Sequence, residues 1–164
     1  MCIRDSSDLV LVSSMGRLLR LPVNDSVLPK MGRLAQGPMT MRLLPGEELV
    51  GSLAINAAET DPTLLLVSRQ GQMTRIDVTP LRRCQRGDLG MMAVALSSDE
   101  DGVVGLCSGA ALAGIVTDQK RHGRLDAAAV NLSEAGESWI DQLNLESGEQ
   151  IVSVVALQLS LIHI

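Results

Sequence analysis

The chain repeats one pattern three times, and this repetition constrains its fold more than any other feature. The segment LVLVSSMGRLLRL from Leu9 returns as LLLVSRQGQMTRI from Leu64, and a weaker third copy reads GIVTDQKRHGRL. A shared glycine marks the copies, with 55 residues from Gly16 to Gly71 and 52 from Gly71 to Gly123. Self-similarity at this period is typical of propellers and solenoid arrays, in which each unit buries its face only against its neighbours.

The closing segments of the units repeat as well. The sequence LLPGEELV at 43–50 returns as LESGEQIV at 145–152, and DGVV at 101–104 is a looser middle copy. We therefore expect three units, over residues 7–57, 62–108 and 110–158.

The two terminal hexapeptides, MCIRDS and LSLIHI, do not follow the repeat. Their back-translations are reverse complements over nearly their whole length, as two read-throughs of one sequencing adapter would be. We therefore expect residues 1–6 and 159–164 to be non-native, with the true termini of the protein missing.

Short apolar runs bounded by Gly, Pro, Asp and Asn predict β-strands, and Gly16, Gly71 and Gly123 are expected in hairpin turns that need a positive φ. The chain has no Phe or Tyr, so its core must be aliphatic. Four antiparallel strands in about 50 residues describe a propeller blade, and the predicted fold is all-β. The expected strands are 8–13, 17–23, 38–44 and 48–55, then 63–68, 72–78, 91–96 and 102–107, then 112–117, 123–130, 138–145 and 149–157.

Positive charge recurs with the repeat although the formal net charge is −5. From Ser7 to Pro45, and again from Pro62 to Leu96, five basic residues face two acidic ones. The acidic residues gather in the linking turns. The run at 99–101 is interpreted as a solvated turn, because three acids in sequence without a ligand-spaced loop do not form a cation cage. The uneven distribution of basic and acidic residues along the chain indicates the kind of partner rather than the fold.

Each of the first two units has one long basic connection between its second and third strands. An arginine precedes a glycine by four residues in both, at Arg33 and Gly37 and at Arg86 and Gly90. Stacked repeats would place recurrent arginines on one rim, where the guanidinium fork suits phosphate. The lack of aromatic residues favours duplex over single-stranded nucleic acid. The candidate DNA-binding residues are Arg17, Arg20, Lys30, Arg33, Arg69, Arg75, Arg82, Arg83 and Arg86.

These motifs resemble the C-terminal domain of the bacterial DNA gyrase A subunit, and that of its topoisomerase IV relative. The resemblance rests on LVSSMGRLLRLPV followed by MGRLAQG, and on LLLVSRQGQMTRIDV followed by RCQRGDLG, which look closest to cyanobacterial gyrase A. It is strong through about Gly105 and weaker beyond. The glutamine-arginine-arginine-glycine-glycine box that distinguishes gyrase is absent, and Gln85, Arg86 and Gly87 form only a fragment of it. Topoisomerase IV therefore stays open as the parent.

The resemblance implies about three blades of a six-bladed β-pinwheel whose basic rim bends and wraps double-stranded DNA. It implies a parent type IIA topoisomerase that uses ATP and Mg²⁺ and contains a second A subunit together with the gyrase B subunit. It also implies a place in the bacterial cytoplasm, at the nucleoid.

No catalytic constellation is visible in the sequence. The chain lacks the tyrosine that this enzyme class uses to break DNA, and it lacks a phosphate-binding loop. Cys84, Cys107 and His122 fit no zinc motif, so neither a metal nor another cofactor is expected in this chain. No stretch is a plausible membrane span. A protein-interaction propeller remains the main alternative, because a fold does not fix a function. A hydrolase propeller lacks any convergent His or acidic group.

Overall fold

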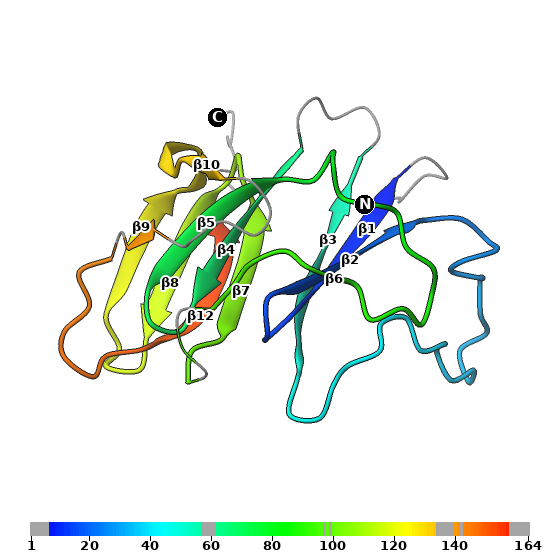
Figure 1. Ribbon diagram of the computed structural model, residues 1–164, viewed down its shortest axis with the longest axis horizontal. Helices are drawn as coiled ribbons and strands as arrows, with labels where there is room; N and C mark the ends of the chain where they lie inside the picture. The colour runs from blue at the N-terminus through cyan, green and yellow to red at the C-terminus, as the bar shows by residue number, and fades with distance from the viewer. Residues whose placement is uncertain are drawn as a thin grey trace, which may run out of the picture.

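Three β-sheets follow one another in the computed structural model, which describes residues 7–56, 62–96, 98, 100–133, 140–141 and 143–157. Figure 1 shows the first sheet on the right and the other two on the left. Within the described ranges there is no α-helix, and one 3₁₀ turn, η1, covers Ala127–Ala129. The predicted all-β fold of repeated blades is confirmed. The terminal hexapeptides lie outside the described residues.

The first blade contains β3 (Leu49–Ile55), β1 (Asp8–Ser13), β2 (Arg17–Pro22) and β6 (Met91–Met92), in that order. The second blade contains β7 (Val103–Ser108), β4 (Thr63–Ser68), β5 (Gln72–Asp77) and β10 (Leu132–Ser133), and β11 (Ile140–Asp141) also pairs with β5. The third blade contains β12 (Ile151–Leu157), β8 (Leu112–Thr117) and β9 (His122–Asp126).

The outer strand of a blade comes from the next unit, which corrects the expectation that each unit builds its own four strands. β6 belongs to the second unit by sequence but pairs with β2 of the first blade. β10 and β11 belong to the third unit but pair with β5 of the second. The expected strand 91–96 is therefore reduced to β6. Of the expected strand 138–145, the structure shows β11, and residues 138, 139 and 142 lie outside the described residues.

The expected strand at 38–44 is wrong, since these residues form no β-ladder. Its counterpart in the second unit, β6, exists only because a preceding blade offers an edge to it. The backbone of residues 38–44 bonds instead to the long loop of the second unit, through Thr40 and Gly87 and through Arg42 and Asp88.

Blade stacking buries two aliphatic cores. Leu64 and Leu66 belong to the core shared with the first blade, and Leu65 and Val67 belong to the core shared with the third. Successive side chains of β4 point to opposite faces, so a strand covered on both sides needs an unbroken apolar run. This explains the LLLV sequence at 64–67.

Two of the three predicted glycine turns are confirmed. Gly16 has a φ of 78° and Gly71 a φ of 88°, a region that suits glycine because it lacks a side chain. In both turns a serine at the end of the preceding strand accepts a hydrogen bond from the amide four residues later, at 3.2 Å.

The third turn differs from the prediction. Lys120, with a φ of 64°, occupies the place of Gly16 and Gly71, and Thr117 replaces the serine by accepting from the Arg121 amide at 3.2 Å. Gly123 lies within β9 opposite Ile115. The prediction aligned the nearest glycine, whereas the turn itself is formed by TDQKR at 117–121.

Candidate nucleic-acid interface

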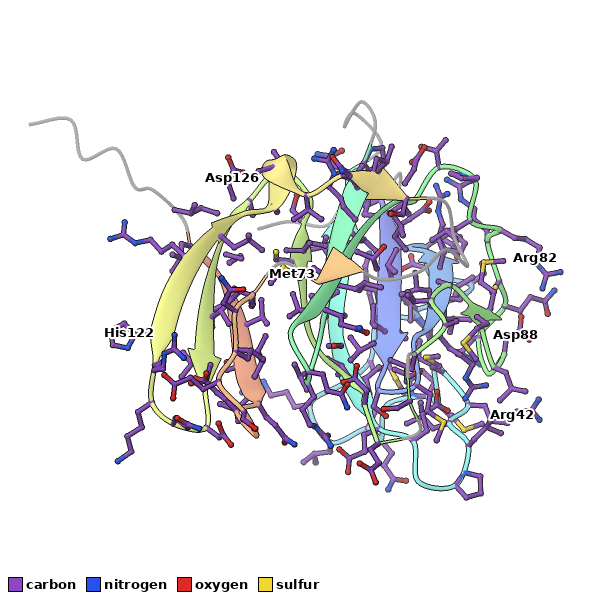
Figure 2. The ribbon with its side chains drawn as sticks, turned by 60° about the vertical axis from the view of Figure 1, so that its left-hand side comes forward. Arg42, Met73, Arg82, Asp88, His122 and Asp126 are labelled. Carbon is purple, nitrogen blue, oxygen red and sulfur yellow. The ribbon has the colours of Figure 1, made fainter. Side chains whose placement is uncertain are left out.

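Two long loops from consecutive units lie side by side and form one surface, here called the loop pair, of residues 23–46 and 78–90. The Arg42 amide donates to the Asp88 carbonyl at 3.0 Å, and the Gly87 amide donates to the Thr40 carbonyl at 2.8 Å. Figure 2 shows Arg42, Arg82 and Asp88 together on the side of the first blade, with His122 at the opposite end. Backbone hydrogen bonds hold the two loops together, and the basic side chains of the loops are exposed.

The loop pair carries an excess of positive charge. Its acidic residues are Asp25 and Asp88, against six exposed basic residues, an excess of four. Lys30 approaches Asp25 at 3.8 Å, with both side chains largely exposed, and such a surface pair contributes little. The six basic residues are Lys30, Arg33, Arg42, Arg82, Arg83 and Arg86.

Arg83 is partly held by a buried carboxylate, and Arg86 Nη1 makes a long contact of 3.5 Å with the Val27 carbonyl. Arg83 Nε lies 3.1 Å from Asp8 Oδ2, while 59% of the Arg83 side chain remains exposed. The other end of the Arg83 guanidinium is therefore still available to an anion.

Arg17 does not lie on the predicted rim. Its side chain is buried, and its guanidinium forms a two-pronged ion pair with the buried Glu47, with Nε 2.9 Å from Oε1 and Nη2 against Oε2. Burial, and secondarily the charge of Arg42, lowers the pKa of Arg17. Its role in the structure is to hold the turn before β3 against β2.

Arg20 does not lie on the predicted rim either. It pairs with Asp8 through Nε at 2.7 Å and Nη2 at 2.6 Å. Its Nη1 donates to the carbonyls of Val78 at 2.7 Å, Thr79 at 3.1 Å and Leu81 at 3.1 Å. Arg20 therefore fastens the first blade to the loop of the next unit.

Arg75 repeats this contact one blade further on. It faces Leu65 across the hairpin as Arg20 faces Val10, and its Nη1 donates to the Ala128 carbonyl at 2.9 Å. Its buried Nε has no hydrogen-bond acceptor among the described residues. Thr63 occupies the register position of Asp8, so the carboxylate that serves Arg20 is missing here.

Arg69 is exposed but lies in the β4–β5 turn rather than on the loop pair. Its amide donates to the Gly102 carbonyl at 2.8 Å, and its side chain lines a hollow with Ser14 and Gly46. Of the nine predicted residues, the loop pair thus brings together five: Lys30, Arg33, Arg82, Arg83 and Arg86. Arg42, which was not among the predicted site residues, also lies exposed on the loop pair.

Asp101 is buried, which corrects the interpretation of the run at 99–101 as a solvated turn, whereas Glu100 is exposed. Glu47, Asp101 and Glu149 hold the same place in the three units, and all three are buried. Asp101 Oδ1 accepts from the amides of Gln70 at 3.1 Å and Gly102 at 2.8 Å. These acids are structural caps of their turns.

Glu149 is held in its turn by an arginine and a backbone amide, as Glu47 is. Its Oε2 accepts from Arg121 Nη1 at 2.6 Å and from the Glu146 amide at 2.9 Å. The pKa of Glu149 is lowered by hydrogen bonding to the Thr117 side chain and the Glu146 amide, with a further contribution from Arg121.

Cys84, Cys107 and His122 belong to no metal-binding group among the described residues. Cys84 and Cys107 are buried free thiols, and burial raises the pKa of Cys107 to about 11, so it stays protonated and unreactive at neutral pH. His122 is exposed in β9. Across the described ranges no group of three His, Cys, Asp or Glu side chains could hold a metal ion, and no helix is long and apolar enough to cross a membrane.

The first two units match a known family model. The family is described as DNA gyrase C-terminal domain, beta-propeller, and the match covers residues 7–56 and 62–106. The chain belongs to this family. Its context is thus that of a topoisomerase subunit.

Curated relatives agree with this assignment. The A subunit of DNA gyrase from Mycolicibacterium smegmatis is 25% identical over 156 residues, which are 90% of this chain and 17% of that protein. The A subunit of DNA gyrase from Streptomyces coelicolor is 30% identical over 98 residues, which are 60% of this chain and 11% of that protein. The chain therefore spans less than a fifth of the length of these relatives.

Solved structures share the fold. The C-terminal domain of DNA topoisomerase IV superposes with a TM-score of 0.77 at 21% identity, over 94% of this chain and 48% of that one. The E. coli ParC C-terminal domain superposes with a TM-score of 0.66 at 17% identity, over 94% of this chain and 63% of that one.

Proposed function

We propose that this chain binds double-stranded DNA through the loop pair and bends it, as part of the C-terminal domain of a DNA gyrase A subunit. The observation that carries the proposal is the set of six exposed basic residues on two adjacent loops, in a chain of the gyrase C-terminal-domain family. The first two units carry equivalent basic loops, so a duplex following the rim would meet basic side chains from both.

The chemistry favours contacts to the DNA backbone. Arginine forks pair with phosphate, and their binding releases condensed counterions from the duplex. The chain has no Phe or Tyr to stack on exposed bases, which supports duplex over single-stranded DNA. Sequence preference would then be weak and would arise from the ease of bending.

In this proposal the chain itself performs no catalysis, since it has no tyrosine to attack a phosphodiester. It serves a bacterial, cytoplasmic and nucleoid-associated type IIA topoisomerase that couples ATP and Mg²⁺ to changes in DNA topology. A second A subunit, together with the gyrase B subunit, would join through parts of the parent outside this chain. A topoisomerase IV A subunit is the second candidate parent, because the box that distinguishes gyrase is absent from this chain.

Charge reversal on the loop pair tests the proposal. Fluorescence anisotropy with a labelled duplex of about 40 base pairs would measure affinity, and energy transfer between labels at its ends would measure bending. We expect Arg82→Glu with Arg86→Glu to lower affinity at least tenfold and to abolish the bend. The matched control is Lys120→Glu with Arg124→Glu, which makes the same change in charge on exposed residues of the third blade.

Equal losses in the two double variants would refute a specific surface on the loop pair. Wild-type protein that binds no duplex, but captures a protein by a contact indifferent to salt, would favour the protein-interaction propeller.

A further inference from the structure

A hollow at the joint between the first and second blades lies apart from the proposed DNA surface. It has a volume of about 680 Å³ and forms where the β1–β2 turn, the β4–β5 turn and the connection from β6 to β7 meet. Of the residues that line it, only Gly46 belongs to the loop pair. Pockets of this size accept a small molecule or a few side chains of a bound segment.

Part of the wall of the hollow is apolar and open to solvent. Met15, in the β1–β2 turn, is 37% exposed, and Met92, at the end of β6, is 59% exposed. The exposed Ala95 and the partly buried Leu96 continue this surface. Methionine side chains are flexible and polarizable, so they adapt to the shape of an apolar partner. The hollow therefore offers apolar contacts that the fold itself does not use.

The rest of the wall is predominantly acidic. Asp101 and Glu100 line the hollow, and Arg69 is the basic residue among the described residues of its wall. The exposed Glu48 lies at the edge of the hollow, because its carbonyl accepts from the Ser14 amide at 2.8 Å and its amide donates to Ser14 Oγ at 3.0 Å. Three acids against one arginine give this surface the opposite sign of charge from the loop pair.

Two of the three units balance the buried acid of the turn before the last strand with an arginine. Glu47 pairs with Arg17, and Glu149 pairs with Arg121. Each of these arginines directly follows the residue of positive φ in its hairpin turn. In the second unit the same position is Gln72, which carries no charge. The second unit therefore lacks the internal cation of the other two.

The corresponding acid of the second unit, Asp101, has no counterion in contact with it. Its Oδ1 caps the turn, but its buried Oδ2 has no hydrogen-bond partner among the described residues. Arg69 lines the same hollow without forming an ion pair with Asp101. A buried charge without a partner is costly, and water screens it little. A cation that enters the hollow beside Asp101 is therefore attracted to it.

We propose that this hollow binds a segment of a partner protein in which a basic side chain stands next to apolar ones. The apolar side chains contact Met15 and Met92, and the basic side chain lies beside Asp101 and Glu100. The excess of carboxylates disfavours an acidic segment and also the phosphates of DNA. The partner and the duplex therefore use different side chains of this chain.

Selection of short random peptides displayed on phage, with the whole chain as target, tests the proposal without assuming a sequence. Peptides that also bind the variant Met92→Lys with Asp101→Asn are removed by counter-selection. We expect the remaining peptides to combine Lys or Arg with apolar residues. A fluorescent copy of the most enriched peptide gives the Kd by anisotropy. In methyl spectra of labelled methionine, the signals of Met15 and Met92 should shift on binding and that of Met39 should not.

Single variants separate the two halves of the contact. Met92→Lys and Asp101→Asn should each raise the Kd of this peptide by about tenfold or more. The fold should persist, because Met92 is exposed and asparagine keeps an oxygen that caps the turn. Arg69→Gln should leave the Kd unchanged or lower it, since it removes a like charge from the hollow. The matched controls, Met39→Lys at another exposed methionine and Asp88→Asn at another turn-capping carboxylate, should leave the Kd within about twofold.

Rebuilding the missing internal pair gives an independent test. Gln72→Arg with Asp101→Glu recreates the arrangement of Arg17 and Glu47, so it should supply the cation from within and abolish peptide binding. Duplex affinity of the same variants should not change, so failure of this proposal is distinct from failure of DNA binding. No peptides specific for the wild type, enrichment of acidic sequences, or a Kd unmoved by both Met92→Lys and Asp101→Asn would overturn the proposal.

Discussion

The repeated arginines perform two different tasks. Whether an arginine lies in a strand or in a loop decides which task it performs. Arg17, Arg20 and Arg75 lie in strands and are drawn into ion pairs or carbonyl contacts, whereas Arg33, Arg42, Arg82 and Arg86 lie in loops and remain exposed. The sequence alone could not separate them. The acceptors of Arg17 and Arg20, Glu47 and Asp8, belong to other strands and turns, and only the folded pairing brings them close.

Replacing Arg20 tests the structural task. Arg20→Gln should lower the free energy of unfolding by about 2–4 kcal/mol, because Asp8 and three backbone carbonyls lose their donor in a largely buried place. Urea unfolding measures the change. The control Arg82→Gln, on an exposed side chain, should shift stability by no more than about 0.5 kcal/mol. Equal effects of the two variants would contradict the assigned role.

The buried carboxylate of Glu149 should make stability depend on pH. Its pKa is lowered from the ordinary value of 4.5, so its contribution is complete above that value and is lost as the pH falls through the lowered pKa. The difference in unfolding free energy between wild type and Glu149→Gln should therefore be constant from pH 7 to 5 and shrink below pH 4.5. Glu146→Gln, in the same turn but exposed, is the control. A difference that stays constant to pH 3 would count against this assignment.

Strands that pair with a neighbour in the sequence could be predicted, whereas strands that pair with another unit could not. The hairpins β1–β2 and β4–β5 could be predicted from alternating apolar runs and a glycine turn, because all the information lies within about a dozen residues. The short strands that pair with the preceding blade could not be predicted in this way. β6 and β11 each have only two paired residues, and their partners belong to another unit.

Close stacking of β7 on β12 depends on a small residue at its centre. A Cβ added to Gly105 would lie 2.6 Å from Val154 Cγ2, so Gly105→Ala should separate the second and third blades and cost about 1–3 kcal/mol. Thermal unfolding measures this loss. Gly123→Ala, in β9 with no atom within 4 Å of the added carbon, should change stability little. If Gly105→Ala were as stable as Gly123→Ala, the packing of these two strands would have to be revised.

For DNA binding by the whole molecule, the distribution of charge over the surface matters more than the net charge. The net charge of −5 argues against DNA binding, yet the loop pair holds six exposed basic residues while several acids are buried in turns. The sequence predicted that the charge recurs, and the structure adds which part of it reaches the surface. Buried acids such as Glu47 do not repel a phosphate as exposed ones would, because their charge is balanced by a neighbouring arginine.

A salt titration of duplex binding tests the proposed function most directly. If the loop pair touches about four phosphates, log affinity should fall against log salt with a slope of roughly −3 to −4. Replacing both Arg33 and Arg86 by alanine should weaken binding to all duplex sequences alike and flatten that slope by up to about two. A slope unchanged in the double variant, or a wild-type affinity indifferent to salt, would contradict DNA binding by the loop pair.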